Sequence, residues 1–123
     1  MNEDLIISLA IDRPKRERFR EAMLHPRKRI KILDSLNHNP PLDARRTTWF
    51  SSFKNIVESI NVNPHFEVYL LSSDEKLDGQ IMTFEEAIKQ VPFHGWGTII
   101  GISPDLAIYY GETGEKSAII KRK

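Results

Sequence analysis

The sequence predicts an α+β fold in which N-terminal helices precede the order β-α-β-β-β, with a mostly antiparallel four-stranded sheet. Apolar residues recur at helical spacing in the first half of the chain, whereas in the second half they alternate with polar ones as in strands. The 123 residues, 40% hydrophobic and 28% charged, have the length and composition of one globular domain. We therefore expect a single domain over 1–123, with a helical, basic front half at 1–62 and an acidic, sheet-forming half at 63–123.

The first element is expected to be a short helix. Asn2 is a residue type that caps helices, and Pro14 stops the pattern. Between them stand two acids and a group of apolar residues: Glu3, Asp4, Leu5, Ile6, Leu9 and Ala10. The stretch "LIISLAI" also has strand composition, so a strand is the alternative for this segment.

Two further helices are expected next. In "KRERFREAML", the helical spacing places Phe19, Ala22 and Met23 on one face, with arginines around the rest. Pro26 suits the first turn of the following helix, because the N–H that it lacks is one that no helix would use there. That helix carries Ile30 and Leu33 on one stripe. We expect Phe19, Ile30 and Leu33 to fix these helices to the core.

Another helix is predicted to begin between Asp43 and Thr47. Its apolar residues recur at i, i+4, i+7 and i+11, which is the strongest helical period in the chain: Trp49, Phe53, Ile56 and Ile60. This spacing places Trp49, Phe50 and Phe53 in the core rather than on a surface where they could stack on bases. The stretch "NVNP" ends the helix.

The second half is expected to form most of the sheet. "HFEVYLLSS" is rich in strand-forming residues, and "TFEEAIKQV" is helical, with Thr83 and Glu86 at the spacing of a capping box. In "GTIIGISPDLAIYYGE", Pro104 and Asp105 are suitable central residues for a type I turn, which predicts a hairpin. "GETGEK" offers another turn before the last strand, "SAIIKR".

The stretch "DEKLDGQIMTFEE" matches part of the spacing of a calcium-binding EF-hand loop. Asp74, Asp78 and Glu85 stand at ligand positions of such a loop, and Gly79 stands at its sharp turn. Lys76, however, occupies a position that needs an oxygen ligand, and the residues before the stretch have strand rather than helix composition. We therefore expect a strand end, a glycine turn and a capped helix, and no metal site.

The composition excludes several classes of function. The chain has no cysteine, which excludes disulfide frameworks and thiol chemistry. No segment approaches the roughly 18 apolar residues that a membrane span needs, and the acidic N-terminal stretch is unlike a signal peptide. Phosphate-binding glycine loops and zinc motifs of the HExxH type are absent from the sequence. We expect a cytoplasmic protein with no cofactor, no membrane association and no catalytic machinery of its own.

Charge is distributed unevenly, although the net charge is only +1. Residues 12–31 contain nine Lys or Arg residues against three acids, whereas 58–115 contain ten acids against two lysines. The sequence therefore predicts a non-catalytic, macromolecule-binding domain whose arginine-rich helices contact nucleic acid or an acidic protein. The expected contact residues are Arg16, Arg20, Arg27, Lys28 and Arg29. A solvated surface that balances the acidic half is the alternative, and a second copy of the chain competes as a partner.

Two other functions stay open. A small-molecule binder or enzyme would have its site between the loops at 72–79 and 93–97, where polar groups meet two strand ends: Asp74, Asp78, His94 and Trp96. In "PFHGWG", Gly95 also fits an ordinary helix C-terminal cap. In a purely structural role, "SAIIKR" would be an exposed edge strand that pairs with another chain.

Overall fold

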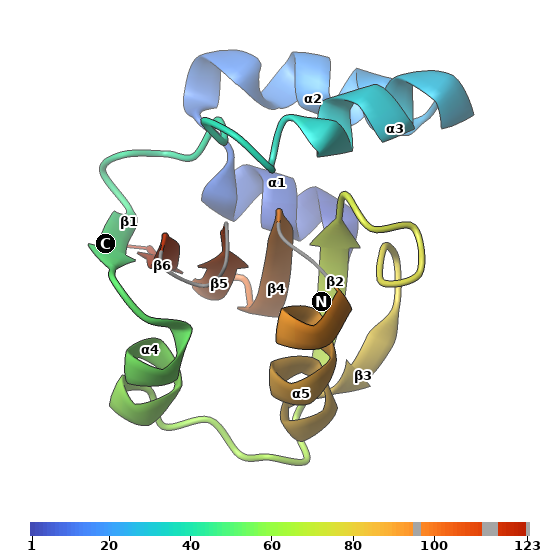
Figure 1. The fold of residues 1–123 in the computed structure, drawn as a ribbon. Helices are drawn as coiled ribbons and strands as arrows, with labels where there is room; N and C mark the ends of the chain where they lie inside the picture. Colours follow the sequence, from blue (N-terminus) through green and yellow to red (C-terminus); the bar gives the residue numbers. More distant parts are fainter. Residues whose placement is uncertain (95–96, 112–115, 123) are drawn as a thin grey trace.

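The computed structural model describes residues 1–94, 97–111 and 116–122 (Figure 1). Within these residues the sheet has six antiparallel strands in the order β1-β6-β5-β4-β2-β3. The predicted α+β class is confirmed. The prediction of a four-stranded sheet is wrong, because the sequence pattern does not reveal the two short edge strands, β1 and β3.

Helices, tight turns and loops connect the strands. In chain order the strands are β1 (Thr47–Phe50), β2 (Glu67–Ser72), β3 (Ile81–Thr83), β4 (Thr98–Ser103), β5 (Leu106–Tyr110) and β6 (Ser117–Lys121). The helices are α1 (Glu3–Ala10), the 3-10 turn η1 (Arg13–Lys15), α2 (Arg16–Met23), α3 (Pro26–Asp34), α4 (Phe53–Ser59) and α5 (Phe84–His94). Across the described ranges, no helix is both long and apolar enough to cross a bilayer.

Helices cover both faces of the sheet (Figure 1). α1 lies on one face, with α2 and α3 above it as an outer layer, and α4 and α5 lie on the opposite face. Alternate residues of each strand face opposite sides, so β5 directs Ala107 and Tyr109 towards α1 and directs Ile108 and Tyr110 towards α4 and α5. The core is therefore divided into two apolar clusters with the sheet between them.

α1 is a helix, as predicted, and the strand alternative is wrong. The Asn2 side chain accepts a hydrogen bond from the N–H of Leu5 (2.9 Å), which caps the first turn. The helix lies very close to β4. At Gly101 a Cβ atom would come within 2.5 Å of Ile6, which is fully buried. The glycine is therefore what permits this close approach of helix and strand.

The α2–α3 pair packs against α1 through two of the three residues predicted to attach it. Phe19 and Leu33 are buried in the cluster around α1, as expected. Ile30 was expected in the same place, but its side chain is 69% exposed. The inner face of α3 carries Arg29 and Leu33, and Ile30 lies about 100° around the helix from Arg29.

Residues 47–60 do not form the single helix that their apolar spacing predicts. The first of them form β1, which pairs with β6 in a register that sets Trp49 opposite Ala118. α4 begins only at Phe53, which is buried. Phe50 is half-buried and Trp49 is 52% exposed, so the prediction of a core position for Trp49 is wrong. Strand pairing with a distant segment overrides the local helical pattern here.

β6 lies inside the sheet, between β5 and β1. The alternative in which "SAIIKR" forms an exposed edge is therefore wrong. The β4–β5 hairpin is confirmed, and the Asp105 N–H donates to Ser103 Oγ (3.2 Å) in its turn. Most of the turn predicted in "GETGEK", residues 111–116, and the predicted cap at Gly95 lie outside the described residues.

The "DEKLDGQ" segment contains the predicted turn, which leads from β2 into β3, a strand absent from the prediction, before α5 begins. Asp74 Oδ1 accepts a hydrogen bond from the Lys76 N–H (2.9 Å), and Gly79 adopts a left-handed φ of 78°. α5 begins after Thr83, whose Oγ1 accepts from the Glu86 N–H (3.2 Å). This hydrogen bond, in which the Thr83 side chain is the acceptor, is one of the two that form the capping box predicted from the sequence.

Candidate functional site

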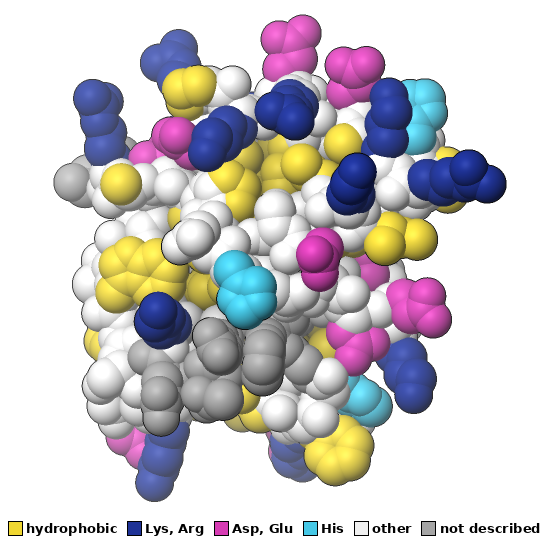
Figure 2. All heavy atoms as spheres, turned by 45° about the horizontal axis from the view of Figure 1, so that its top comes forward, with side chains coloured by type: hydrophobic (Ala, Val, Ile, Leu, Met, Phe, Trp, Pro, Cys, Tyr) yellow, Lys and Arg dark blue, Asp and Glu magenta, His cyan; other side chains and the backbone are white. Residues whose placement is uncertain are grey.

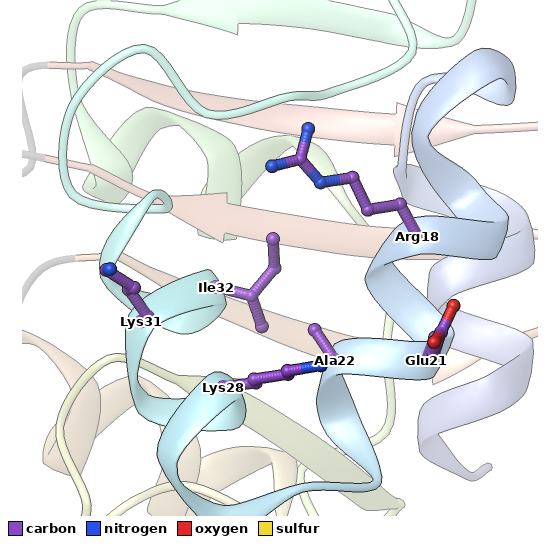
Figure 3. A pocket seen from close by; sticks show the side chains of 6 residues that line it. All are labelled: Arg18, Glu21, Ala22, Lys28, Lys31 and Ile32. Atoms are coloured by element: carbon purple, nitrogen blue, oxygen red, sulfur yellow. The ribbon is translucent and has the colours of Figure 1, made fainter.

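The outer face of α2 and α3 carries many of the basic side chains of the N-terminal segment. Figure 2 shows Lys and Arg side chains gathered around a hydrophobic area on this face. Between the two helices lies a hollow of about 460 Å³ (Figure 3). It is lined by Arg18, Glu21 and Ala22 from α2 and by Lys28, Lys31 and Ile32 from α3. We call this hollow the α2–α3 groove.

The spacing of residues along the two helices explains how the groove forms. Arg18 and Ala22 are one helical turn apart on α2, and Lys28 and Ile32 are one turn apart on α3. The hollow is therefore lined by one cation, one acid and one apolar side chain from α2, and by two cations and one apolar side chain from α3. Phe19 points to a different side of α2 and is buried against α1. One face of the pair attaches it to the domain, and another forms the groove.

The cations of the groove are exposed around an apolar centre. Ile32 lies in the middle of the view in Figure 3, with the side chains of Arg18, Lys28 and Lys31 around it. None of these three cations forms an ion pair with another described residue. Because Glu21 also lines the groove, its lining carries a net charge of about +2.

Two of the predicted contact residues on α2 are bonded inside the molecule. Arg16 donates from Nη2 to Asp43 Oδ2 (3.2 Å), in the loop before β1. Arg20 donates from Nε to Asp4 Oδ1 (2.7 Å) and also hydrogen-bonds the Ser8 hydroxyl, both on α1. These guanidinium groups link α2 to neighbouring segments.

A third predicted contact residue, Arg29, is bonded to two carboxylates. Its Nε donates to Asp78 Oδ2 (2.9 Å) and its Nη1 donates to Glu3 Oε1 (3.1 Å). Burial by itself would lower the pKa of Arg29, but the hydrogen bonds and charges of Asp78 and Glu3 raise that pKa above its ordinary value. Arg29 therefore acts as a cross-link between α3, α1 and the turn after β2.

The other two predicted residues, Arg27 and Lys28, are exposed on α3, and Lys28 lines the groove. Arg18 and Lys31 also line it, although they are not among the predicted contact residues. The sequence does contain one signal for the groove face of α2. Arg18 and Ala22 are one helical turn apart, and this spacing sets a cation beside a small residue.

In the alternative site at 72–79 and 93–97, Asp74 stabilises the turn after β2 and Asp78 is bonded to two other segments. Asp78 is only 14% exposed, and besides its bond to α3 its Oδ1 accepts from the Ser72 N–H (3.2 Å). Trp96 lies outside the described residues. The α2–α3 groove and the other hollows described below are lined by residues other than Asp74, Asp78 and His94.

An exposed tryptophan lines two adjoining hollows at the edge of the sheet. The two hollows share four lining residues: Asn39, Pro40, Trp49 and Lys116. The larger hollow has a volume of about 560 Å³. The Trp49 ring is held edge-on against Tyr109, with 5.9 Å between the ring centroids. Trp49 is thus about half-exposed while one side of its ring contacts Tyr109.

The lining of the α2–α3 groove combines charged and aliphatic side chains. Its polar groups are cations and one carboxylate, and its centre is aliphatic. In the parts of the chain that the structure describes, no group of three or more His, Asp or Glu side chains is placed to hold a metal ion. No protein-family model matches the chain, and no curated protein or solved structure matches it significantly.

Proposed function

We propose that the protein binds an acidic segment of another protein in the α2–α3 groove. The observation that carries the proposal is the set of exposed cations, Arg18, Lys28 and Lys31, around the apolar floor formed by Ala22 and Ile32. Carboxylates of the partner would form charge-assisted hydrogen bonds at the rim, and an apolar side chain of the partner would be buried on the floor.

Exposed apolar residues nearby favour a protein partner over nucleic acid. Leu24, in the link between α2 and α3, is 78% exposed, and Ile30 of α3 is also largely exposed. Protein–nucleic acid interfaces are more polar and much more positively charged than protein–protein interfaces, whereas the net charge of this chain is +1. Nucleic acid is therefore the alternative outcome of the test.

The test is a binding measurement by fluorescence anisotropy, with a labelled helical peptide in which Glu and Leu residues recur on one face. Lys28→Gln/Lys31→Gln removes two charges from the rim and should weaken binding about tenfold or more. Lys54→Gln/Lys89→Gln is the matched control, because it removes the same charge from exposed positions on α4 and α5, across the sheet. The control should leave the affinity unchanged.

Salt and a competitor separate the outcomes. Peptide binding should weaken from low to physiological salt, because exposed charges are screened. An affinity that does not change with salt, or an equal loss in both double variants, would contradict an interface in the groove. A DNA or RNA duplex that binds more tightly than the peptide, and loses affinity in the Lys28→Gln/Lys31→Gln variant, would identify nucleic acid as the partner.

A further inference from the structure

We infer that a second site, separate from the α2–α3 groove, binds a phosphate-type oxyanion that carries at least two negative charges. The site is a polar hollow of about 810 Å³ between the segment that follows α1 and the segment that precedes β1. Its charged lining residues are Asp12, Arg13, Arg16, Asp43, Arg45 and Arg46. It shares no lining residue with the groove, so the inference does not depend on the proposed function.

Backbone hydrogen bonds fix the two walls of the hollow. The Asp12 N–H donates to the Pro41 carbonyl (2.8 Å), and the Asp43 N–H donates to the Ala10 carbonyl (2.8 Å). These bonds flank an isolated antiparallel bridge between the two segments. The segments that supply the arginines are therefore held together by the fold itself, and a ligand would not have to bring them together.

One carboxylate orients two of the arginines. Asp43 Oδ2 lies 3.2 Å from Arg16 Nη2 and 3.7 Å from Arg46 Nε. Arg46 also donates from Nη1 to the carbonyls of Ser8 (2.9 Å) and Leu9 (3.1 Å), in the last turn of α1. Two mostly buried cations thus share one anion, and their positive charge is only partly balanced.

The other charged residues that line the hollow increase its excess of positive charge. Arg13 and Arg45 are exposed, and neither side chain forms an ion pair with a described residue. With Asp12 as the second carboxylate, four arginines face two acids. Burial lowers the pKa of Arg16, and the charge of Arg46 lowers it further, although Asp43 opposes both effects. A bound anion would relieve this repulsion.

The residue type indicates the class of ligand. All four cations in the hollow are arginines, whose planar fork of N–H donors matches the oxygens of phosphate in a way that the point charge of lysine does not. A ligand with two or more negative charges can balance the whole excess, whereas a monovalent anion cannot. Pyrophosphate, either free or as the tail of a nucleotide, has this chemistry.

The experiment titrates inorganic pyrophosphate and inorganic phosphate into the full chain by calorimetry. We expect one pyrophosphate to bind per chain, more tightly than phosphate, and to raise the midpoint of thermal unfolding. Arg13→Gln and Arg45→Gln each replace an exposed arginine that makes no structural ion pair with a described residue, and each should weaken pyrophosphate binding about tenfold. Arg27→Gln, which removes an exposed arginine from α3, is the matched control and should leave binding unchanged.

Several outcomes would overturn the inference or refine it. No binding at millimolar pyrophosphate, or an equal loss in the Arg27→Gln control, would overturn it. Titration with ADP separates the two sources of the anion: ADP binding tighter than pyrophosphate supports a nucleotide tail, and ADP binding no tighter supports the free anion. Lys28→Gln/Lys31→Gln should not change pyrophosphate binding, so failure at this site is distinguishable from failure of the proposed groove function.

Discussion

Arg29 Nε lies 2.9 Å from Asp78 Oδ2 and so joins α3 to the turn after β2, 49 positions further along the chain. Through Nη1 the same guanidinium reaches Glu3 of α1 (3.1 Å). Tyr69 adds to the network, because its hydroxyl donates to Glu3 Oε1 (3.4 Å). One cation therefore links three segments, and this internal role accounts for an arginine in the middle of the basic segment.

Asp78→Asn should lower the free energy of unfolding by about 1 to 3 kcal/mol, because a mostly buried guanidinium then loses an anionic partner but keeps its desolvation cost. Urea denaturation at neutral pH measures this change. The double variant Arg29→Gln/Asp78→Asn should lose less stability than the sum of the two single variants, since the residues share one interaction. If the stability loss of the double variant equals the sum of the two single losses, the Arg29–Asp78 contact contributes nothing to stability.

Gly101 leaves no space for a side chain between β4 and α1. A methyl group there would meet Ile6 at 2.5 Å, and Ile6 is fully buried. Gly101→Ala should therefore lower the free energy of unfolding by about 1 to 3 kcal/mol. Adding Ile6→Val, which shortens the opposing side chain, should recover part of that loss. A Gly101→Ala chain as stable as the unmodified one would mean that α1 moves away from the sheet at little cost.

Local chemistry explains which elements of the fold are predictable from the sequence. Asn2 caps α1 through the Leu5 N–H, and Thr83 caps α5 through the Glu86 N–H, so both helix starts depend on residues three positions apart. The edge strand β1 depends on β6, which lies far along the chain. No local pattern in "TTWF" records that pairing, and the apolar spacing around it favours a helix instead.

In the candidate site, too, local features are predictable from the sequence, whereas contacts between distant segments are not. The basic composition of residues 12–31 is visible in the sequence, and Lys28 is exposed in the groove. The sequence does not show that Arg16 and Arg29 are bonded to Asp43 and Asp78, because those acids lie on other elements. Which cations remain available to a partner is decided by the tertiary fold.

Ile30 and Leu33 are close on α3 but should respond differently to truncation. Ile30 is largely exposed, whereas Leu33 is buried in the cluster around α1. Ile30→Ala should change the free energy of unfolding by less than about 0.5 kcal/mol, and Leu33→Ala should lower it by about 2 to 5 kcal/mol. Denaturation of both variants under one set of conditions gives the comparison. Similar losses would mean that Ile30 also packs against the domain.

Tyr110 should make stability depend on pH in the alkaline range. Burial raises the pKa of its phenol above the ordinary value of 10.0. Below pH 10 the phenol is protonated in both the folded and the unfolded chain, so its contribution to stability is fully present. As the pH rises above 10, the unfolded chain loses this proton first, and the contribution is lost up to the raised pKa of the folded chain.

Tyr110→Phe removes this titration and isolates its effect. The free energy of unfolding, measured in urea from about pH 8 to about pH 11, should fall less steeply above pH 10 in the variant than in the unmodified chain. Some decline should remain, because burial and the charge of Glu3 also raise the pKa of Tyr69. The other ionisable groups are common to both chains, so their effects cancel in the comparison. Parallel curves would therefore mean that the Tyr110 phenol has the same pKa in the folded and unfolded states.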